Sequence, residues 1–560
     1  MKLLKLTVLT VTLISLIGCG KSRNTSLTGW NERDMAAGGF STPKKYKGQA
    51  TPPGMVLVEG GTFTMGHVQD DVMFDWNTTP KKQQVRSFYM DQTEVTNQEY
   101  IFYLEWVEKV FPPNNENYKH IYTSTLPDTL VWRNRLGFNE SLTETYLRHP
   151  AYANYPVVGV SWVQATDYCK WRTDRVNEKI LMGKGIMKNL FAMDSLTVEG
   201  RDHFVTDTYL LNPRFMFDGD SSIYKRGIPV RKVRKRGQRG QRGQRGQFTG
   251  RHVKTSDGIL FPKYRLPTES EWEFAAKALS ENRNYNDLRG RKKYPWNGRY
   301  TRNKSKKYRG DQLANFKLGK GDYSGIAGWS NDGADITIAV RSYPPNANGL
   351  FDMAGNVAEW VADVYRPIID TEANDFNYYR GNVFSKPKID REGRVVIADY
   401  TTIDYDTLDN GRIVPADKPG NIIYVPITKR DAFMRNNYEK SYNVDYKDGD
   451  LASTRSFEKE EEELDARPRM YNHPTIPKVI GEGGMRRQIY DEKTRRTLIS
   501  DKTRVYKGGS WADREYWLDP AQRRYLPQYS ATNYIGFRCA MDRLGPMTNA
   551  KRSAYPNNKN

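Results

Sequence analysis

Apolar and polar positions alternate over short stretches separated by glycine, and long periodic runs are rare. Along Met55–Gly66 this alternation predicts a strand, a turn at Gly60 and Gly61, and a returning strand. A second apolar stretch, Pro156–Trp162, predicts a further short strand. Short strands joined by glycine-rich turns indicate a folded region that keeps much of its chain in loops.

Three segments are predicted to be helices, from side chains at helical spacing, from a residue that can cap a helix, or from both. The first helix is predicted to start at Thr96 or Asn97, and the second to cover Gln164–Asn177. The third follows Thr268, with Glu271 three residues later in the arrangement of a capping box. The positions on the helical faces of the first two segments are Tyr100, Tyr103, Leu104, Ala165, Tyr168, Cys169 and Arg172.

The N-terminus has the pattern of a bacterial lipoprotein signal. Its apolar core, Leu6–Ile17, follows two lysines and is too short for a comfortable membrane span. We therefore predict a signal peptide at 1–18, a lipid on the sulfur of Cys19, and a polar tether over 19–53. The residues directly after Cys19 are not acidic, which favours the outer membrane. An ordinary secretory signal with a chance cysteine is the alternative.

The aromatic content indicates the kind of core, and the net charge indicates the kind of partner. The 560-residue chain has a formal charge of +21 and contains 36 Tyr, 21 Phe and 12 Trp, so we expect an aromatic core. In an extracytoplasmic protein this charge favours acidic protein faces, lipopolysaccharide or cell-wall polymer as partners, and no nucleic acid. The six histidines are widely dispersed, so the sequence contains no local histidine motif for a metal.

Eight short motifs occur in order along the chain. They are Met55–Gly66, Phe88–Asn97, Pro156–Trp162, Tyr264–Ala276, Tyr294–Trp296, Asn348–Trp360, Lys507–Trp511 and Gly536–Ala540. In this order they resemble the formylglycine-generating-enzyme family, also called the sulfatase-modifying factors. The resemblance implies an α+β fold that is rich in loops and related to the C-type lectin fold. It also implies one domain over 54–543, followed by a polar tail at 544–560.

Two long insertions interrupt the order of motifs, at about 183–257 and 366–503. The first contains a basic low-complexity run, 225–251, for which a solvated loop is the simplest interpretation and an electrostatic docking arm the alternative. The second contains an acidic run, 458–465, which we interpret as a solvated helix face. We expect both insertions to lie outside the core.

Two positions argue against catalysis. Enzymes of the family oxidise a substrate cysteine with two cysteines that follow the Lys507–Trp511 motif, and the resemblance places Asp513 and Leu518 there. Neither side chain can be a thiolate, bind copper through sulfur or exchange a disulfide. We therefore predict a pseudoenzyme, which keeps the family scaffold without its redox chemistry.

The resemblance also implies a structural disulfide between Cys169 and Cys539. These are the two cysteines that remain once Cys19 carries lipid, and an extracytoplasmic compartment permits disulfides. The bond would connect the second predicted helix to the last strand of the domain, and would hold both insertions outside the core.

Two structural calcium sites are a further implication of the resemblance. Calcium prefers a cage of about six to eight oxygen ligands. The two expected ligand sets are Asn315, the Phe316 carbonyl, Asp332 and the Ala334 carbonyl, and Asp352, the Gly355 carbonyl, the Val357 carbonyl and Glu359. In the alternative interpretation, Asp352 and Glu359 cap turns and pair with arginines.

The lipid anchor, the missing cysteine pair and the charged insertions together resemble the gliding-motility lipoproteins of Bacteroidota. This resemblance implies a structural component on the periplasmic face of the outer membrane, serving gliding and type IX secretion. Its expected partners are other lipoproteins of that machinery and periplasmic ring proteins. A periplasmic glycan-binding module of lectin-like fold is the first alternative, and a formylglycine-generating oxidase is the second.

Overall fold

The two ends of the described chain meet in the fold. The computed structural model describes residues 48–67, 77–134, 136–189, 203–228, 251–279, 292–298, 300–318, 334–366, 378–381, 385–408, 410–427, 475–479, 486–490 and 502–545. The amide nitrogen of Gln49 donates to the sulfur of Met541 at 3.3 Å, and its amide oxygen accepts from the Leu544 backbone at 2.7 Å. The last residues of the expected tether therefore pack against the end of the domain.

One sheet is closed by the C-terminal strand. Its four strands lie in the order β1 (Met55–Val58), β4 (Phe88–Asp91), β16 (Ala540–Asp542) and β5 (Tyr264–Arg265), and each neighbouring pair is antiparallel. Because β16 lies between β4 and β5, the domain is complete only when its last residues are in place.

The prediction of a turn at Gly60 and Gly61 is wrong, because the strand that follows does not return along the first one. β2 (Gly61–Met65) pairs with β3 (Lys81–Val85), and the register continues that of β1 on β4. The chain runs straight on through Gly60, where a Cβ would lie 2.4 Å from the carbonyl oxygen of Val85. Glycine is required here for the close approach of two strands and not for a turn.

The second sheet brings together segments from the two ends of the second insertion. Its order is β14 (Arg524–Pro527), β13 (Thr503–Lys507), β6 (Ala358–Val364) and β15 (Ile535–Gly536). β15 is parallel to β6 and the other two pairs are antiparallel. Every residue of β6 is buried, so this strand forms the centre of the sheet.

The three predicted helices are present. α2 (Asn97–Val110) is capped by Thr96, and α7 (Glu269–Lys277) by Thr268, each in a complete capping box. α5 (Trp162–Gly183) starts earlier and ends later than predicted. The shorter helices are α3 (Lys119–Thr125), α4 (Glu140–Arg148) and α6 (Thr206–Leu211). Single helical turns lie at Thr129–Trp132, Pro150–Tyr152, Pro213–Phe215, Phe217–Gly219, Ser221–Ile223, Thr255–Asp257 and Glu515–Leu518.

The strand predicted at Pro156–Trp162 is replaced by an extended segment without a ladder. Pro156 forms an isolated bridge with Thr96, the Val157 backbone donates to Val95, and the Gly159 backbone donates to Thr532. These hydrogen bonds go to different partners, so the segment connects loops instead of extending a sheet.

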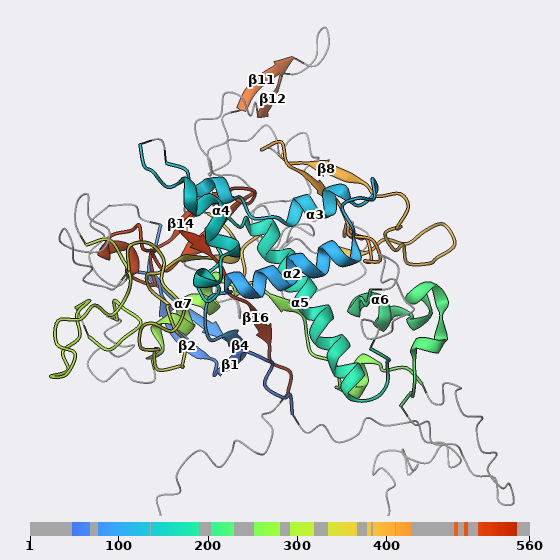
Figure 1. The fold of residues 1–560 in the computed structure, drawn as a ribbon, viewed down its shortest axis with the longest axis horizontal. Helices are drawn as coiled ribbons and strands as arrows, with labels where there is room; N and C mark the ends of the chain where they lie inside the picture. Colours follow the sequence, from blue (N-terminus) through green and yellow to red (C-terminus); the bar gives the residue numbers. More distant parts are fainter. Residues whose placement is uncertain are drawn as a thin grey trace, which may run out of the picture.

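The core is aromatic, as predicted, and lies where α2 and α5 cross (Figure 1). Tyr100 stacks on Tyr168 with ring centroids 5.7 Å apart, and Phe537 meets the Tyr168 ring edge-on at 5.3 Å. Tyr100, Tyr103 and Phe537 have no exposed surface. Among the described residues, no helix combines the length and the apolar character needed to cross a bilayer.

The described parts of both insertions pack against this core, contrary to our expectation. The first insertion contributes buried side chains, among them Phe204, Tyr209 and Ile223. The second insertion forms small ribbons, and the hydroxyl of Thr208 donates to the carbonyl of Gly420 at 2.7 Å, which joins the two insertions. The ribbon strands are β7 (Ser385–Pro387), β8 (Tyr405–Thr407), β9 (Ile413–Pro415), β10 (Tyr424–Pro426), β11 (Thr475–Val479) and β12 (Arg486–Tyr490). The insertions pack against the core because they contain apolar side chains, and removing these side chains from water is favourable.

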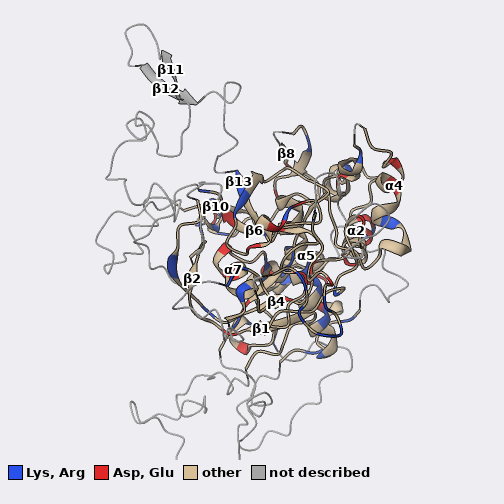
Figure 2. Cartoon of the chain, turned by 90° about the vertical axis from the view of Figure 1, so that its left-hand side faces the viewer, with Lys and Arg blue, Asp and Glu red and all other residues tan. Residues whose placement is uncertain are grey.

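A buried group of ion pairs fixes α7 to the second sheet. The ammonium of Lys507 lies 2.8 Å from Glu273 and 3.3 Å from Glu269, and Arg523 donates to Glu269 at 2.5 Å. Lys277 approaches the other oxygen of Glu273 at 2.8 Å. Figure 2 shows acidic and basic positions meeting in this region, between α7, β6 and β13. Each charge has an opposite partner, which buried charges require.

Candidate functional site

The Lys507–Trp511 segment leads from β13 to Asp513 and Leu518, the positions that the resemblance assigns to the family's cysteine pair. Gly508 lies against the ring of Trp272, where a Cβ would come within 3.0 Å of a ring carbon. Gly509 has φ +66°, and a Cβ there would lie 2.8 Å from the carbonyl oxygen of Trp517. Both glycines are therefore needed for this turn to pack tightly.

Asp513 is held in a closed polar cluster. Both carboxylate oxygens accept from the guanidinium of Arg524, at 2.5 and 2.6 Å, and the hydroxyl of Ser510 donates to the second oxygen at 2.5 Å. The Arg524 guanidinium lies 4.8 Å from the ring centre of Tyr506 and 4.6 Å from that of Trp517. A carboxylate bound in this way stabilises the turn and is not available as a nucleophile.

Leu518, at the second of the two positions, belongs to the core. It has no exposed surface and packs in an apolar cluster with Tyr294, Ala314, Phe316 and Ala354. The buried Leu518 side chain stabilises the fold through apolar contacts and has no group that could carry out redox chemistry. The pair of positions therefore contains an ion-paired carboxylate and a buried leucine, and no sulfur.

Glu359 is fully satisfied by protein partners. The guanidinium of Arg538 donates to its two oxygens at 2.7 and 2.6 Å, and the indole N–H of Trp272 donates at 2.8 Å. Glu359 and Arg538 have no exposed surface. This arrangement agrees with the alternative in which the carboxylate pairs with an arginine.

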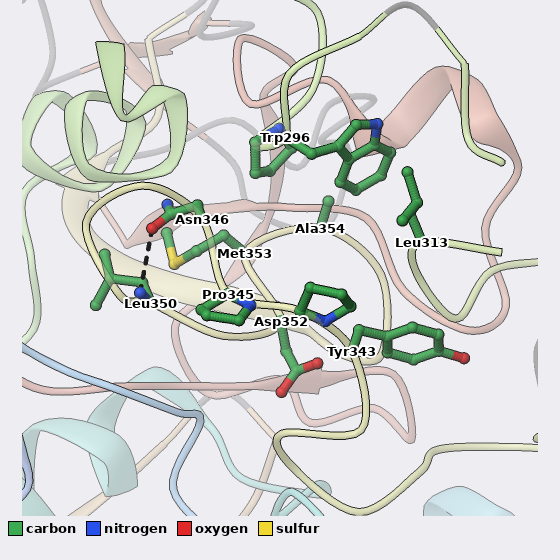
Figure 3. Close-up of a pocket in the computed structure, with 11 residues that line it drawn as sticks. Trp296, Leu313, Tyr343, Pro345, Asn346, Leu350, Asp352, Met353 and Ala354 are labelled. Carbon is green, nitrogen blue, oxygen red and sulfur yellow. Dashed lines mark hydrogen bonds between the residues drawn. The ribbon is translucent and has the colours of Figure 1, made fainter. Parts of the chain in front are cut away.

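Asp352 has one carboxylate oxygen without a partner. Its other oxygen accepts from the Arg341 backbone at 2.9 Å, while Oδ1 is buried and makes no hydrogen bond. Burial raises the pKa of Asp352 to about 6. The residue has φ +55°, and Figure 3 shows its carboxylate pointing away from Trp296. A buried unpaired oxygen is costly, so this atom fits a cation or a proton.

The second expected calcium set thus fits a cation only in part, since Asp352 offers an oxygen and Glu359 does not. The turn between them is tight, because a Cβ on Gly355 would lie 2.3 Å from the carbonyl oxygen of Asn315. The Val357 backbone donates to Glu94 at 3.2 Å. In the parts of the chain that the structure describes, no three His, Cys, Asp or Glu side chains are grouped to hold a metal.

The first expected calcium set is only partly within the described residues. The side-chain amide of Asn315 donates to the carbonyl of Ile336 at 2.7 Å, and its backbone carbonyl accepts from Asn356 at 2.9 Å. Phe316 and Ala334 are buried. Asp332 lies outside the described residues. Asn315 therefore connects the two loops that the resemblance assigned to calcium.

Sequence reasoning missed Glu94, which lies beside Asp352 and Glu359. Its oxygens accept from the side-chain amide of Asn356 at 2.7 Å and from the Val357 backbone. Burial, followed by the charges of Asp352 and Glu359, raises the pKa of Glu94 well above its ordinary value. Its place directly before the capped helix gave no local signal, because the contact depends on residues more than 250 positions away.

Cys169 and Cys539 are neighbours in the core. Both are buried thiols in this structure, and their sulfurs lie 3.5 Å apart. The fold thus brings together the two cysteines that the resemblance paired, and their disulfide stays a prediction. Cys19, the acidic run and the central part of the basic run lie outside the described residues.

A family profile matches most of the domain. The profile is described as "Sulfatase-modifying factor enzyme 1-like domain" and matches residues 40–398. The segment with Asp513 and Leu518 lies beyond this match, but it connects β13 to β14 within the second sheet, and β16 further along completes the first sheet. The matched and unmatched parts therefore form one fold.

Several relatives are similar to this chain over shorter or more distant matches. The inactive C-alpha-formylglycine-generating enzyme 2 of Mus musculus is 38% identical over 104 residues, covering 18% of this chain and 27% of that protein. The formylglycine-generating enzyme of the same organism is 23% identical over 350 residues, covering 60% and 68%. The formylglycine-generating enzyme of Streptomyces coelicolor is 34% identical over 125 residues, covering 22% and 34%. In two of these three matches, the chain spans about a third or less of the relative.

Solved structures resemble the chain more weakly. PvdO from Pseudomonas aeruginosa has a TM-score of 0.34 at 14% identity, with 89% of this chain and 100% of that chain covered. Treponema denticola variable protein 1 has a TM-score of 0.32 at 15% identity, with 87% and 94% covered. The assignment therefore rests on the profile, which covers more than half of the sequence. The chain belongs to the family of sulfatase-modifying factor enzyme 1-like domains.

Proposed function

We propose that this protein is a non-catalytic structural component of the gliding-motility and type IX secretion machinery, of the GldJ type. The observation that carries the non-catalytic part is the state of Asp513, whose two oxygens are occupied by Arg524 and Ser510. Leu518 is buried in the apolar core, so the two positions supply no thiolate for oxidation of a substrate cysteine. The family contains proteins described as inactive, which is consistent with this proposal.

The proposal places the protein on the periplasmic face of the outer membrane, held by lipid on Cys19. Its partners are other gliding and type IX secretion lipoproteins and periplasmic ring proteins, and nucleic acid is not among them. The signal pattern before Cys19 and the missing cysteine pair support this assignment through resemblance alone.

Calcium is part of the proposal as a structural ion. Asp352 supports it, because its Oδ1 is buried without a hydrogen bond. The carbonyls of Gly355 and Val357 would complete such a site from the same turn. Bound there, the ion would offset the charge of the buried Asp352 carboxylate, and it would take no part in chemistry.

An affinity pull-down from detergent-solubilised envelope tests the proposed function. The tagged full chain should recover motility and secretion lipoproteins, and a tagged unrelated outer-membrane lipoprotein should not. Recovery of envelope glycan without those proteins would favour the glycan-binding alternative.

The catalytic alternative is tested separately. The purified protein, given copper and a cysteine peptide of sulfatase type, should form no aldehyde. Turnover of that peptide would overturn the assignment as a pseudoenzyme, whatever the pull-down recovers.

A further inference from the structure

The segment Thr301–Leu313 forms a loop that hydrogen bonds hold in place and whose surface is rich in exposed cations. The Leu313 backbone donates to Thr301 at 2.8 Å, the Asn303 backbone donates to Asp311 at 2.8 Å, and the Gly310 backbone donates to Asn303 at 3.1 Å. The guanidinium of Arg302 donates to the Gly310 carbonyl at 2.7 Å. Backbone bonds across its base therefore fix the loop, which lies in yellow-green at the edge of the molecule (Figure 1).

The 301–313 loop exposes positive charge that Asp311, its single acidic residue, offsets only in part. Five of its side chains are exposed cations, and the sequence has no acidic residue from Leu288 to Gly310. None of the five forms an ion pair with a described residue. They are Arg302, Lys304, Lys306, Lys307 and Arg309. Clustered like charges repel one another, so an anionic partner gains from binding them.

Two exposed tyrosines lie among these cations. Tyr300 is 63% exposed and Tyr308 is 48% exposed. The ammonium of Lys304 lies 4.9 Å from the ring centre of Tyr300, and that of Lys307 lies 4.9 Å from the ring centre of Tyr308. Exposed tyrosine and arginine are typical of protein interfaces. Because one face of each ring is covered by an ammonium, carboxylates suit this surface better than the flat faces of sugar rings.

The loop rises from the rim of a small, mostly apolar cavity that Asn346 and Asp352 also line. The cavity has a volume of about 40 Å³ and is lined in part by Pro295, Trp296, Leu313 and Tyr343. The indole N–H of Trp296 donates to the carbonyl of Tyr300 at 2.9 Å, which fixes the rim to the loop. Figure 3 shows Trp296, Leu313 and Tyr343 around this space. A cavity of this size accepts a methyl-sized group of a partner beside the positive surface.

We propose that the 301–313 loop and this cavity form a docking surface for an acidic segment of a partner protein. Carboxylates of the segment pair with the exposed lysines and arginines, and one small apolar side chain enters the cavity. This inference rests on the proposed scaffold function, since it names the face through which the scaffold contacts its machinery.

Binding of a labelled polyglutamate peptide to the detergent-solubilised full chain tests the surface directly. The variant Lys304→Glu, Lys306→Glu, Lys307→Glu should weaken binding at least tenfold, measured by fluorescence anisotropy, because it reverses three charges at the surface. The matched control Lys82→Glu, Lys119→Glu, Lys184→Glu has the same net charge change at exposed positions elsewhere, and should change binding less than twofold. Equal melting temperatures would show that both variants are folded.

Equal binding by the loop variant and the wild type would overturn the proposal. So would tighter, loop-dependent binding of polygalacturonate or single-stranded DNA than of polyglutamate, because the partner would then be an anionic glycan or a nucleic acid. The envelope pull-down separates this inference from the proposed function. If the wild type recovers no secretion or motility lipoprotein but still binds polyglutamate through the loop, the proposed function fails and the docking surface stands.

Discussion

At the scale of single residues, the contacts of Asp513 determine what this side chain can do. It lies between a hydroxyl and a guanidinium, and its side chain is only 14% exposed. Arg524 is equally enclosed, at 15%. Removing either partner leaves the other charge desolvated, which costs more than the pair contributes. We therefore expect Asp513 to contribute to the stability of the fold.

Asp513→Ala should destabilise the protein by about 3 kcal/mol, because Arg524 is left without its carboxylate. Urea unfolding followed by tryptophan fluorescence measures the change. The double variant Asp513→Leu, Arg524→Met should recover part of the loss, since it removes both charges. A loss below about 0.5 kcal/mol for the single variant would contradict the structural role.

Asp352 gives the corresponding test for calcium. Chelation should lower the melting temperature of the wild type, because a bound ion stabilises only the folded chain. Asp352→Asn should remove most of the calcium-dependent shift. As a control, Glu359→Gln should lower the melting temperature equally with and without calcium, because it weakens the bond to Arg538. An unchanged wild-type melting temperature after chelation would leave both turns without calcium.

At the scale of elements, local signals were predictable and distant pairings were not. The capping boxes at Thr96 and Thr268 depend on residues three positions apart, so the sequence located both helices. The partner of β1 is β4, and Gly60 serves a close approach that a local pattern cannot distinguish from a turn. In the candidate site, the sequence alone shows that positions 513 and 518 are not cysteines. The place of Glu94 could not be predicted, since it meets Asp352 only in the fold.

The contact between α7 and β13 predicts a dependence on pH. Burial alone would raise the pKa of Glu273, but Lys277 and Lys507 overcome this and lower it to about 2. A lowered carboxyl pKa contributes stability above the unfolded value of about 4.3, and that stability is lost as the pH falls toward 2.

Glu273→Gln should therefore be less stable than the wild type at neutral pH, and should lose less stability between about pH 4.3 and pH 2. Denaturant unfolding at several pH values measures the difference. Glu144→Gln, at an exposed position of α4, is the control and should follow the wild type. Parallel curves for Glu273→Gln and the wild type would show that the buried carboxylate does not couple folding to pH.

Cys169 on α5 and Cys539, between β15 and β16, connect elements that are far apart in the sequence. Because their sulfurs are 3.5 Å apart, we expect a disulfide if the protein is in the oxidising compartment that we propose for it. In the chain-entropy account, closing so long a loop contributes upwards of about 4 kcal/mol. Non-reducing peptide mapping of the envelope protein should give one linked pair of peptides. Two thiols that react with an alkylating reagent in the unfolded, unreduced protein would refute the bond.

At the scale of the whole molecule, the charged insertions are not separate from the domain. Their described parts contribute to the aromatic core and bond to each other through Thr208 and Gly420. The chain ends also meet, since Gln49 packs beside the C-terminal strand. The described chain therefore begins next to β16.

The anchor itself gives the last prediction. Cys19→Ser removes the sulfur that would receive lipid, so the variant should lack palmitate and leave the outer-membrane fraction. Its folded domain should have the melting temperature of the wild type, because the packing contacts of the described residues, which start at residue 48, do not involve position 19. Radiolabelled palmitate and membrane fractionation provide the measurement, with Ser22→Ala as the matched control. Full retention of Cys19→Ser in the outer membrane, with its palmitate label intact, would refute lipidation at this position. Release of the folded variant would show that the lipid alone holds the domain at the membrane.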